Sequence, residues 1–338
     1  MRHAALALVF LALAMPALAA RPAAAFEPDG LTPARIEATP IERFSLLGDR
    51  AGVLTFLGGL RLSGDIESLS GLAALEHDRF VSVTDKGDWA VIALERERGG
   101  LTGASIRTAP IAADIVGRRD KLDVDAEGVA IAPDRSVLVA FESRARVLGF
   151  APDGRRVGSV PIRIPLNELR DNQGIEALAA APDGTVLAVT EYSIDPEGNA
   201  FAALIAGART GVLSVRLTDG FRPTGATFLP DGDLVLLERS FSRLSLRMRM
   251  RRIARDDIRP GAVLDGPVLM EAGLASEIDN MEGIAAHRDG RGTVLTVVSD
   301  DNGSFLQRTL LLEFLLPDGA GTPPVPVPRM RPRGSRSS

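Results

Sequence analysis

Residues 127–142 read EGVAIAPDRSVLVAFE: an acid and a small residue, an apolar run, a turn, a second apolar run and a closing acid. Four other stretches follow this order, two of them with a hydroxyl as the first residue: SGLAALEHDRFVSVTD (70–85), EALAAAPDGTVLAVTE (176–191), TGATFLPDGDLVLLE (224–238) and EGIAAHRDGRGTVLTVVSD (282–300). Each stretch predicts a β-hairpin, because short apolar runs flank a turn rich in Pro, Asp and Gly. The copies start about 50 to 60 residues apart, which indicates a repeat architecture.

Further strand-like runs follow most hairpins. In the second copy, residues 146–150 and 157–164 add two runs, so that one unit holds four antiparallel strands, the composition of a propeller blade. We therefore predict an all-β protein, a β-propeller with four-stranded antiparallel blades. Residues 41–62 and 309–316 are left to complete or close the ring, and we favour six blades, with five as the alternative. The alternating stretch 247–251 (RMRMR) predicts an outer strand with a solvated arginine face.

The first residues are typical of an export signal. Arg2 precedes an apolar run over residues 4–20, and small-x-small patterns suited to signal peptidase follow it. The run is shorter than the about 20 strongly apolar residues of a membrane-spanning helix. We expect a signal peptide over residues 1–25, cleaved after Ala19, Ala20 or Ala25, and hence a periplasmic or secreted protein without stable membrane insertion.

The remaining chain is expected to form one propeller domain over residues 26–316. The tail at 317–338 is rich in Pro, Gly, Ser and Arg, and we expect it to be disordered.

Composition excludes several functional classes. The 338 residues carry a formal net charge of −5 and no cysteine, which argues against a nucleic-acid partner and excludes cysteine nucleophiles and disulfides. Beyond the expected signal only His77 and His287 remain, both predicted at the turn end of their hairpins, away from the acids. A Ser-His-Asp triad or a His-rich zinc site is therefore disfavoured. We expect a monomer that acts on a small anionic or ester substrate.

Acids recur at the open ends of the hairpins. In an antiparallel hairpin the first residue of one strand lies beside the last residue of the next. Because the first strand of a blade is innermost, we expect eight carboxylates to converge at one mouth of the channel: Asp85, Glu127, Glu142, Glu176, Glu191, Glu238, Glu282 and Asp300. Such crowded charges favour bound hard cations with oxygen ligands, Ca²⁺ above all. Hydrogen bonding of the acids to backbone amides is the alternative.

Basic and amide side chains lie close to these acids in the sequence. We expect them to contact substrate oxygens: Lys86, Arg144, Asn172, Arg239, Asn280, Asn302 and Arg308.

Several motifs together resemble the phytase-like family, described as having esterase-like activity. They are GGLRLSG, SGLAAL, VTDKGDW, DAEGVAIAPD, NQGIEALAAAPDG, DNMEGIA and VVSDDNGSFLQRTLLLEF, spread over roughly residues 55 to 316. The resemblance implies that the repeated Glu and Asp residues carry phosphoesterase activity. The third unit departs from the pattern with Glu-Ala in place of Glu-Gly, and the fourth with Thr-Gly.

The leading hypothesis is a Ca²⁺-dependent hydrolase of phosphate or carboxylic esters, with Glu127, Glu176 and Glu282 as catalytic groups. One alternative is a propeller lactonase with a single central divalent ion and an Asn among its few ligands. Another is a non-enzymatic, metal-stabilised binding module. Propellers host all three functions, so the fold alone does not choose between them.

Overall fold

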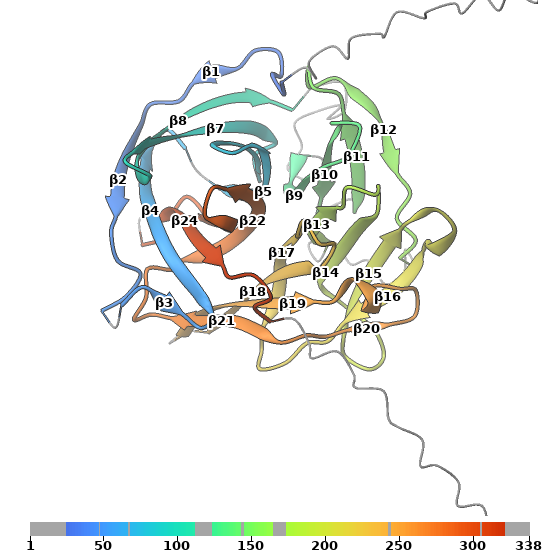
Figure 1. Ribbon diagram of the computed structural model, residues 1–338. Coiled ribbons are helices and arrows are strands. Elements are labelled where there is room, and N and C mark those ends of the chain that lie inside the picture. Colours follow the sequence, from blue (N-terminus) through green and yellow to red (C-terminus); the bar gives the residue numbers. More distant parts are fainter. Residues whose placement is uncertain are drawn as a thin grey trace, which may run out of the picture.

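The described residues of this computed structural model form five antiparallel sheets arranged as blades around a central axis (Figure 1). They are residues 25–46, 48–66, 68–111, 124–142, 145–164, 174–242, 245–304 and 306–321. The predicted all-β propeller is thus confirmed. The preference for six blades is wrong and the five-bladed alternative is right, because the segments at 41–62 and 309–316 join an existing blade. The expected signal peptide lies almost wholly outside the described residues, as does most of the expected tail.

Blades 1 to 3 follow one another along the chain. Blade 1 contains β5 (Leu69–Glu76), β6 (Arg79–Thr84), β7 (Asp88–Glu97) and β8 (Gly100–Pro110), with β1 (Thr32–Pro33) at its outer edge. Blade 2 contains β9 (Ala126–Ile131), β10 (Val137–Phe141), β11 (Arg146–Phe150) and β12 (Arg156–Val160). Blade 3 contains β13 (Ile175–Ala180), β14 (Val186–Ile194), β15 (Ala200–Ile205) and β16 (Gly211–Val215), with β20 (Val263–Leu264) parallel to its edge.

Blade 4 and blade 5 complete the ring. Blade 4 contains β17 (Arg222–Phe228), β18 (Leu234–Ser242), β19 (Ser245–Ile253) and β21 (Val268–Gly273). Blade 5 contains β22 (Asn280–Asp289), β23 (Gly292–Asp300), β24 (Thr309–Leu316), β4 (Leu54–Gly64) and β2 (Ile36–Ile41), with β3 (Arg50–Ala51) paired to β4. The described helices are two short 3₁₀ turns, Gly207–Arg209 and Arg255–Asp257. Among the described residues, no helix has the length and apolar character to cross a membrane.

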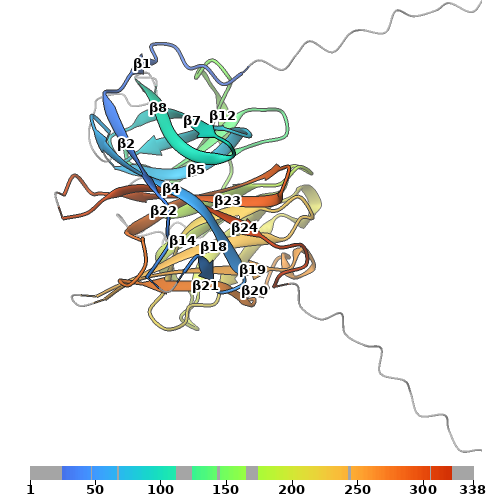
Figure 2. The same cartoon turned by 60° about the vertical axis from the view of Figure 1, so that its left-hand side comes forward.

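The two ends of the chain close the ring by sharing blade 5. Strand β4 pairs antiparallel with β24, with Leu60 opposite Leu311, and Figure 2 shows the two strands side by side. Because the chain has no cysteine, backbone hydrogen bonds rather than a disulfide join these two parts of the sequence.

Apolar side chains fill the five interfaces between neighbouring blades. One cluster of buried residues occupies each interface, so the core is a ring of five parts. Between blades 1 and 2, for example, Trp89 packs edge-on against Phe150 with ring centroids 5.1 Å apart. Because every blade buries both faces against neighbours, the strands read as nearly continuous apolar runs.

The innermost strands carry a β-bulge close to their first residues. In blades 2 to 5 the extra, unpaired residue is Glu127, Glu176, Thr224 or Glu282, and β5 has a similar register shift after Ser70. A bulge re-aims its side chain and bends the strand. The repeated acid of the sequence motif is therefore the bulged residue at the channel.

The small residue after each bulge lets the inner strands approach closely. A Cβ atom on Gly283 would lie 2.6 Å from the carbonyl carbon of Gly71, and one on Gly128 would lie 2.9 Å from the carbonyl oxygen of Glu176. Both distances are shorter than real contacts allow. In this two-residue pattern the acid points into the channel, and the small residue after it allows the backbones of the inner strands to pack closely. The closely packed backbones form a narrow part of the channel, called the channel neck below.

The prediction of a solvated arginine face on residues 247–251 is wrong. This stretch belongs to β19, the third strand of blade 4, and Arg249 and Arg251 are buried. Both guanidinium groups are ion-paired to the buried carboxylate of Glu238, at N–O distances of 2.8 and 2.7 Å.

Candidate metal centre

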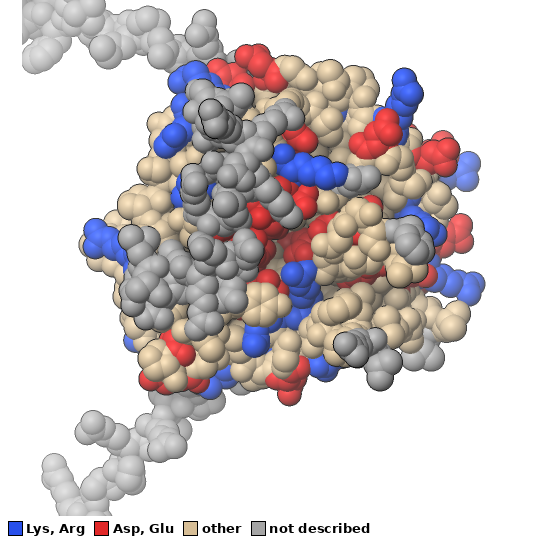
Figure 3. Space-filling model, turned by 180° about the vertical axis from the view of Figure 1, so that it is seen from behind, with Lys and Arg blue, Asp and Glu red and all other residues tan. Residues whose placement is uncertain are grey.

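Three positions of each blade meet at one mouth of the channel. The bulge position holds Ser70, Glu127, Glu176, Thr224 and Glu282 in blades 1 to 5. The exit position lies late in the second strand or directly after it and holds Asp85, Glu142, Glu191, Arg239 and Asp300. The entry position, two residues before the bulge, holds Ser68, Asp125, Gly174, Arg222 and Asn280. Figure 3 shows Asp and Glu side chains gathered about the centre of this face, next to basic side chains.

The backbone explains why entry and exit positions face each other. The amide N–H of Glu142 donates to the carbonyl of Asp125 at 2.9 Å, and Asn280 lies directly opposite Asp300 in the ladder. These contacts hold the side chains of both positions at the same end of the blade.

Blade 2 is the one blade with a carboxylate at all three positions. Asp125, Glu127 and Glu142 each offer an oxygen, and these three atoms lie within 4.8 Å of one another. Sequence reasoning included Glu127 and Glu142 but missed Asp125. A signal was present, since Asp-Ala-Glu at 125–127 matches Asn-Met-Glu at 280–282.

Burial and mutual repulsion raise the pKa values of the carboxyl groups at this mouth. Burial, followed by the charges of Glu282 and Asp125, raises the pKa of Glu127 well above its ordinary value. Burial and the neighbouring carboxylate of Asp125 raise the pKa of Glu142 to about 7. Burial also raises the pKa of Glu282 to about 8 and that of Asp300 to about 6. In each case burial and nearby like charges outweigh the hydrogen bonds and ion pairs that favour the ionised form.

Glu176 of blade 3 is another deeply buried acid at this mouth. Its side chain is buried, with the residue 5% exposed, and among the described residues no donor or cation is seen to contact its carboxylate. Burial, then the charges of Glu127 and Glu191, raise the pKa of Glu176 well above the usual range. A buried carboxylate is normally hydrogen-bonded, ion-paired or bound to metal.

The donor set fits a hard divalent cation. Every candidate ligand in blade 2 is a carboxylate oxygen, the ligand type of Ca²⁺ and Mg²⁺, and the cluster contains neither sulfur nor imidazole. Asp125, Glu127 and Glu142 would hold such an ion, with Glu176 beside them.

Among the described residues, Arg239 of blade 4 contacts acids of the two neighbouring blades. Its guanidinium donates to the side chains of Glu282 and Asn280, and its Nη2 lies 3.3 Å from a carboxylate oxygen of Glu191. The side chain is 20% exposed, so the pairs are largely shielded from solvent. The opposing charges of Glu282 and Glu191 outweigh burial and raise the pKa of Arg239, which stays charged.

Two further groups extend this basic side, and sequence reasoning missed both. The guanidinium of Arg222 lies over the ring of Tyr192, 5.7 Å from its centroid. Its Nε is buried without a hydrogen-bond partner among the described residues. The Tyr192 hydroxyl contacts Glu191, and burial raises the pKa of Tyr192. Blade 4 and the end of β14 thus present cationic and hydroxyl donors across the mouth from blade 2.

The prediction that Glu238 joins the ring is wrong. Glu238 precedes the exit position by one residue, and successive strand residues point to opposite faces. Its side chain is fully buried between Arg249 and Arg251, and the exit position of blade 4 holds Arg239 instead. The other units place the exit residue fifteen positions after the bulge in blades 1 to 3, a spacing that selects Arg239.

The remaining predicted residues are distributed around the mouth. Asp85 lies at the exit position of blade 1, where one carboxylate oxygen is buried without a partner among the described residues. Lys86 is exposed and lines a different hollow with Asp65 and Asp88. Asn302 is exposed, with its side-chain amide donating to Gln307 at 3.1 Å.

Arg308 is committed to other acids. Its guanidinium contacts Glu277 at 2.5 Å and Asp279 at 3.4 Å, which ties the start of β24 to the segment before β22. Arg144 and Asn172 lie outside the described residues.

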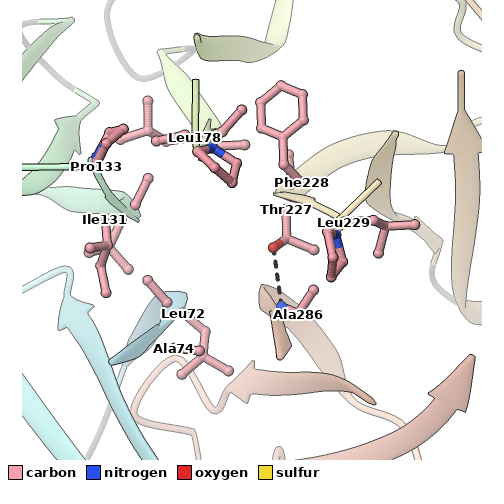
Figure 4. A pocket seen from close by; sticks show the side chains of 18 residues that line it. Leu72, Ala74, Ile131, Pro133, Leu178, Thr227, Phe228, Leu229 and Ala286 are labelled. Carbon is pink, nitrogen blue, oxygen red and sulfur yellow. Dashed lines mark hydrogen bonds between the residues drawn. The ribbon is translucent and has the colours of Figure 1, made fainter. Parts of the chain in front are cut away.

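The opposite mouth is apolar. A cavity of about 410 Å³ is lined there by Leu72, Ile131, Leu178, Phe228 and similar side chains, as Figure 4 shows. Between the mouths, at the level of Gly71 and Gly128, the channel has no room for a water-sized sphere. His77 and His287 stack with ring centroids 5.3 Å apart near this apolar end. The residues that line this cavity include no acidic, basic or histidine side chain.

The fold and the mouth define a five-bladed propeller with an acidic, oxygen-donor site. The family model described as "Esterase-like activity of phytase" (phytase-like) matches residues 65–303, and the chain belongs to this family. Comparison with curated proteins finds no match.

Solved structures of low identity show similar arrangements. A gluconolactonase from Xanthomonas campestris is 17% identical, with a TM-score of 0.41 over 88% of this chain and 99% of that one. The Malassezia sympodialis allergen Mala s 1 is 13% identical, with a TM-score of 0.40 over 79% and 91%. Virginiamycin B lyase from Staphylococcus aureus is 8% identical, with a TM-score of 0.38 over 84% and 100%.

Proposed function

We propose that this protein is an exported hydrolase of phosphate or carboxylic esters that depends on a divalent cation, Ca²⁺ above all. The observation that carries the proposal is that acidic and basic side chains lie on different sides of the mouth. Blade 2 supplies three carboxylates with oxygens within 4.8 Å of one another, and blade 4 supplies Arg239 and Arg222 but no acid. Membership of a family described by esterase-like activity supports the same reaction class.

One side of the mouth would bind the cation and the other side would bind the substrate. Asp125, Glu127 and Glu142 would hold the cation, which would supply Lewis-acid chemistry to the ester when bound. Arg239 and Arg222 orient the substrate by donating to its anionic or carbonyl oxygens. An anionic substrate reaches so acidic a mouth only beside such positive charge.

Glu176 is the proposed group that moves the proton. Burial raises its pKa well above that of an ordinary carboxyl group, and a raised proton affinity of this kind is a property of carboxyl groups that act as general acid or base. It is coupled electrostatically to both Glu127 and Glu282, so it lies where the two halves of the site meet. Glu176 would accept a proton from the attacking water and return it to the leaving alkoxide.

A substrate screen tests the proposal. Purified protein is assayed on phosphomonoesters, phosphodiesters, carboxylic esters and lactones, with added Ca²⁺ and with EGTA. We expect turnover of at least one ester class, abolished by EGTA and restored by Ca²⁺. Glu176→Gln should lower kcat by a factor of about 10² to 10⁴, the usual contribution of acid–base catalysis. A surface control, Glu271→Gln, should leave it unchanged.

Two outcomes would overturn parts of this account. Turnover that persists in EGTA would reject the proposal that activity depends on a divalent cation. No turnover on any class would indicate the non-enzymatic binding module.

A further inference from the structure

Blade 4 breaks the repeat in a systematic way. At the entry, bulge and exit positions it has Arg222, Thr224 and Arg239, whereas each other blade has at least one acid. At the exit position the four other blades all have an acid. The side chain that replaces this acid is a guanidinium, so the local charge changes from −1 to +1.

Arg239 does not extend into solvent as a surface arginine would. Its Nη1 donates to both Glu282 and Asn280 and its Nη2 contacts Glu191, so it bridges side chains from blades 3 and 5. These three partners offer oxygen atoms of the kind that a divalent cation would take. The guanidinium therefore occupies the place where a second ion would find its ligands.

Glu176 provides an independent contrast. It is as deeply buried as Glu282, but among the described residues no cation is seen to contact its carboxylate. Among the described residues, the guanidinium thus contacts acids of blades 3 and 5, and it is not seen to contact the blade 2 carboxylates.

We propose that Arg239 is a built-in cation that fills the second cation position of the mouth, so that the protein binds one divalent ion, at Asp125, Glu127 and Glu142. This inference rests on the metal dependence of the proposed function. An anionic substrate would then meet the exchangeable ion on one side of the mouth and the permanent guanidinium on the other. Because the two positive groups differ, the substrate would bind in one orientation. A ring of several ions would not have this asymmetry.

Replacement of Arg239 by the residue type of the other blades tests the inference. Arg239→Glu supplies the acid found at the other exit positions, next to Glu191, Glu282 and Asn280. Equilibrium dialysis against Ca²⁺, followed by atomic emission, counts ions per chain. We expect one ion in the wild type and two in Arg239→Glu. Arg209→Glu makes the same charge change at an exposed site far from this mouth, and it should leave the count at one.

A second variant keeps the test valid if Arg239→Glu fails to fold. Arg239→Gln removes the charge and keeps an amide oxygen, and circular dichroism checks that each variant retains its strands. We expect a second ion in this variant as well, with weaker affinity than in Arg239→Glu.

The outcomes separate this inference from the proposed function. A wild type that binds no ion rejects the metal dependence itself. A wild type that binds one ion, with still one in both folded Arg239 variants, rejects the role of Arg239 and leaves the hydrolase proposal standing. Two or more ions in the wild type would likewise show that Arg239 does not fill a cation position.

Discussion

Glu238 and Arg239 are neighbours in β18, and their side chains lie on opposite faces of blade 4. Glu238 is enclosed by Arg249 and Arg251 inside the blade, whereas Arg239 contacts Glu282 and Glu191 at the acidic mouth. The two residues therefore have different roles, one in stability and one in the site.

Substitution of Glu238 should destabilise the fold without affecting metal binding. Glu238→Gln removes the buried carboxylate that both guanidinium groups share, and breaking a buried pair in this way costs about 3 to 5 kcal/mol. Urea denaturation should show this loss in the free energy of unfolding. The exposed pair member Glu271, changed to Gln, should cost less than about 1 kcal/mol. Unchanged stability together with lost Ca²⁺ affinity would place Glu238 in the mouth after all.

Calcium should stabilise the folded protein. An ion that binds only the native state adds about 2.7 kcal/mol at a hundredfold excess over its Kd. Differential scanning calorimetry should therefore show a higher Tm in millimolar Ca²⁺ than in EGTA. Glu127→Gln should abolish most of this difference while leaving Tm in EGTA unchanged or higher, because one repelling charge is removed. A Ca²⁺ response equal to that of the wild type would exclude Glu127 as a ligand.

Without metal, stability should fall as pH rises from about 5 to about 8. The folded pKa values of Glu142 and Glu282, about 7 and about 8, lie above the ordinary 4.5. In this range the unfolded chain has released these protons and the folded chain still holds them. Raising the pH therefore favours the unfolded state. Tm measured in EGTA should fall across the range, and less steeply in Glu142→Gln. A Tm that rises over the same range would contradict the raised pKa values.

The channel neck should not tolerate a methyl group. Gly283→Ala would place its Cβ 2.6 Å from the backbone of Gly71, and overpacking of this kind costs about 1 to 3 kcal/mol. Gly158→Ala is the matched control, since no atom lies within 4 Å of the Cβ position there. Chemical denaturation of both variants measures the difference. Equal stabilities would mean that the inner strands are not packed as closely as described.

The fold was largely predictable because the hairpin pattern repeats five times in the sequence. The number of blades was harder to predict, since it depends on how strands that are distant in the sequence pair. Strands β4 and β24 pair in one blade, although each segment resembled part of a separate blade in the sequence. The burial of Arg249 and Arg251 was also hidden. Their alternation with Met248 and Met250 is equally typical of a solvated strand and of one whose arginines meet a buried acid.

The candidate site was predictable where the repeat is regular. Glu127, Glu142, Glu176, Glu191 and Asp300 follow from hairpin symmetry alone. Glu238 was misplaced because a one-residue error in alignment reverses the face of a strand. Arg222 was missed together with Asp125, because the entry position lies two residues before the start of the quoted repeat. Tyr192 could not be found in this way, because its place depends on contacts with Glu191 and Arg222.

The most direct test of the account is to locate the ion. Anomalous diffraction from a crystal soaked in Mn²⁺, a stand-in for Ca²⁺ that scatters anomalously, would show its position. The account predicts one strong peak within coordination distance of the carboxylates of Asp125, Glu127 and Glu142, and none between Arg239 and Glu282. A peak elsewhere in the channel, or none at the blade 2 carboxylates, would contradict it.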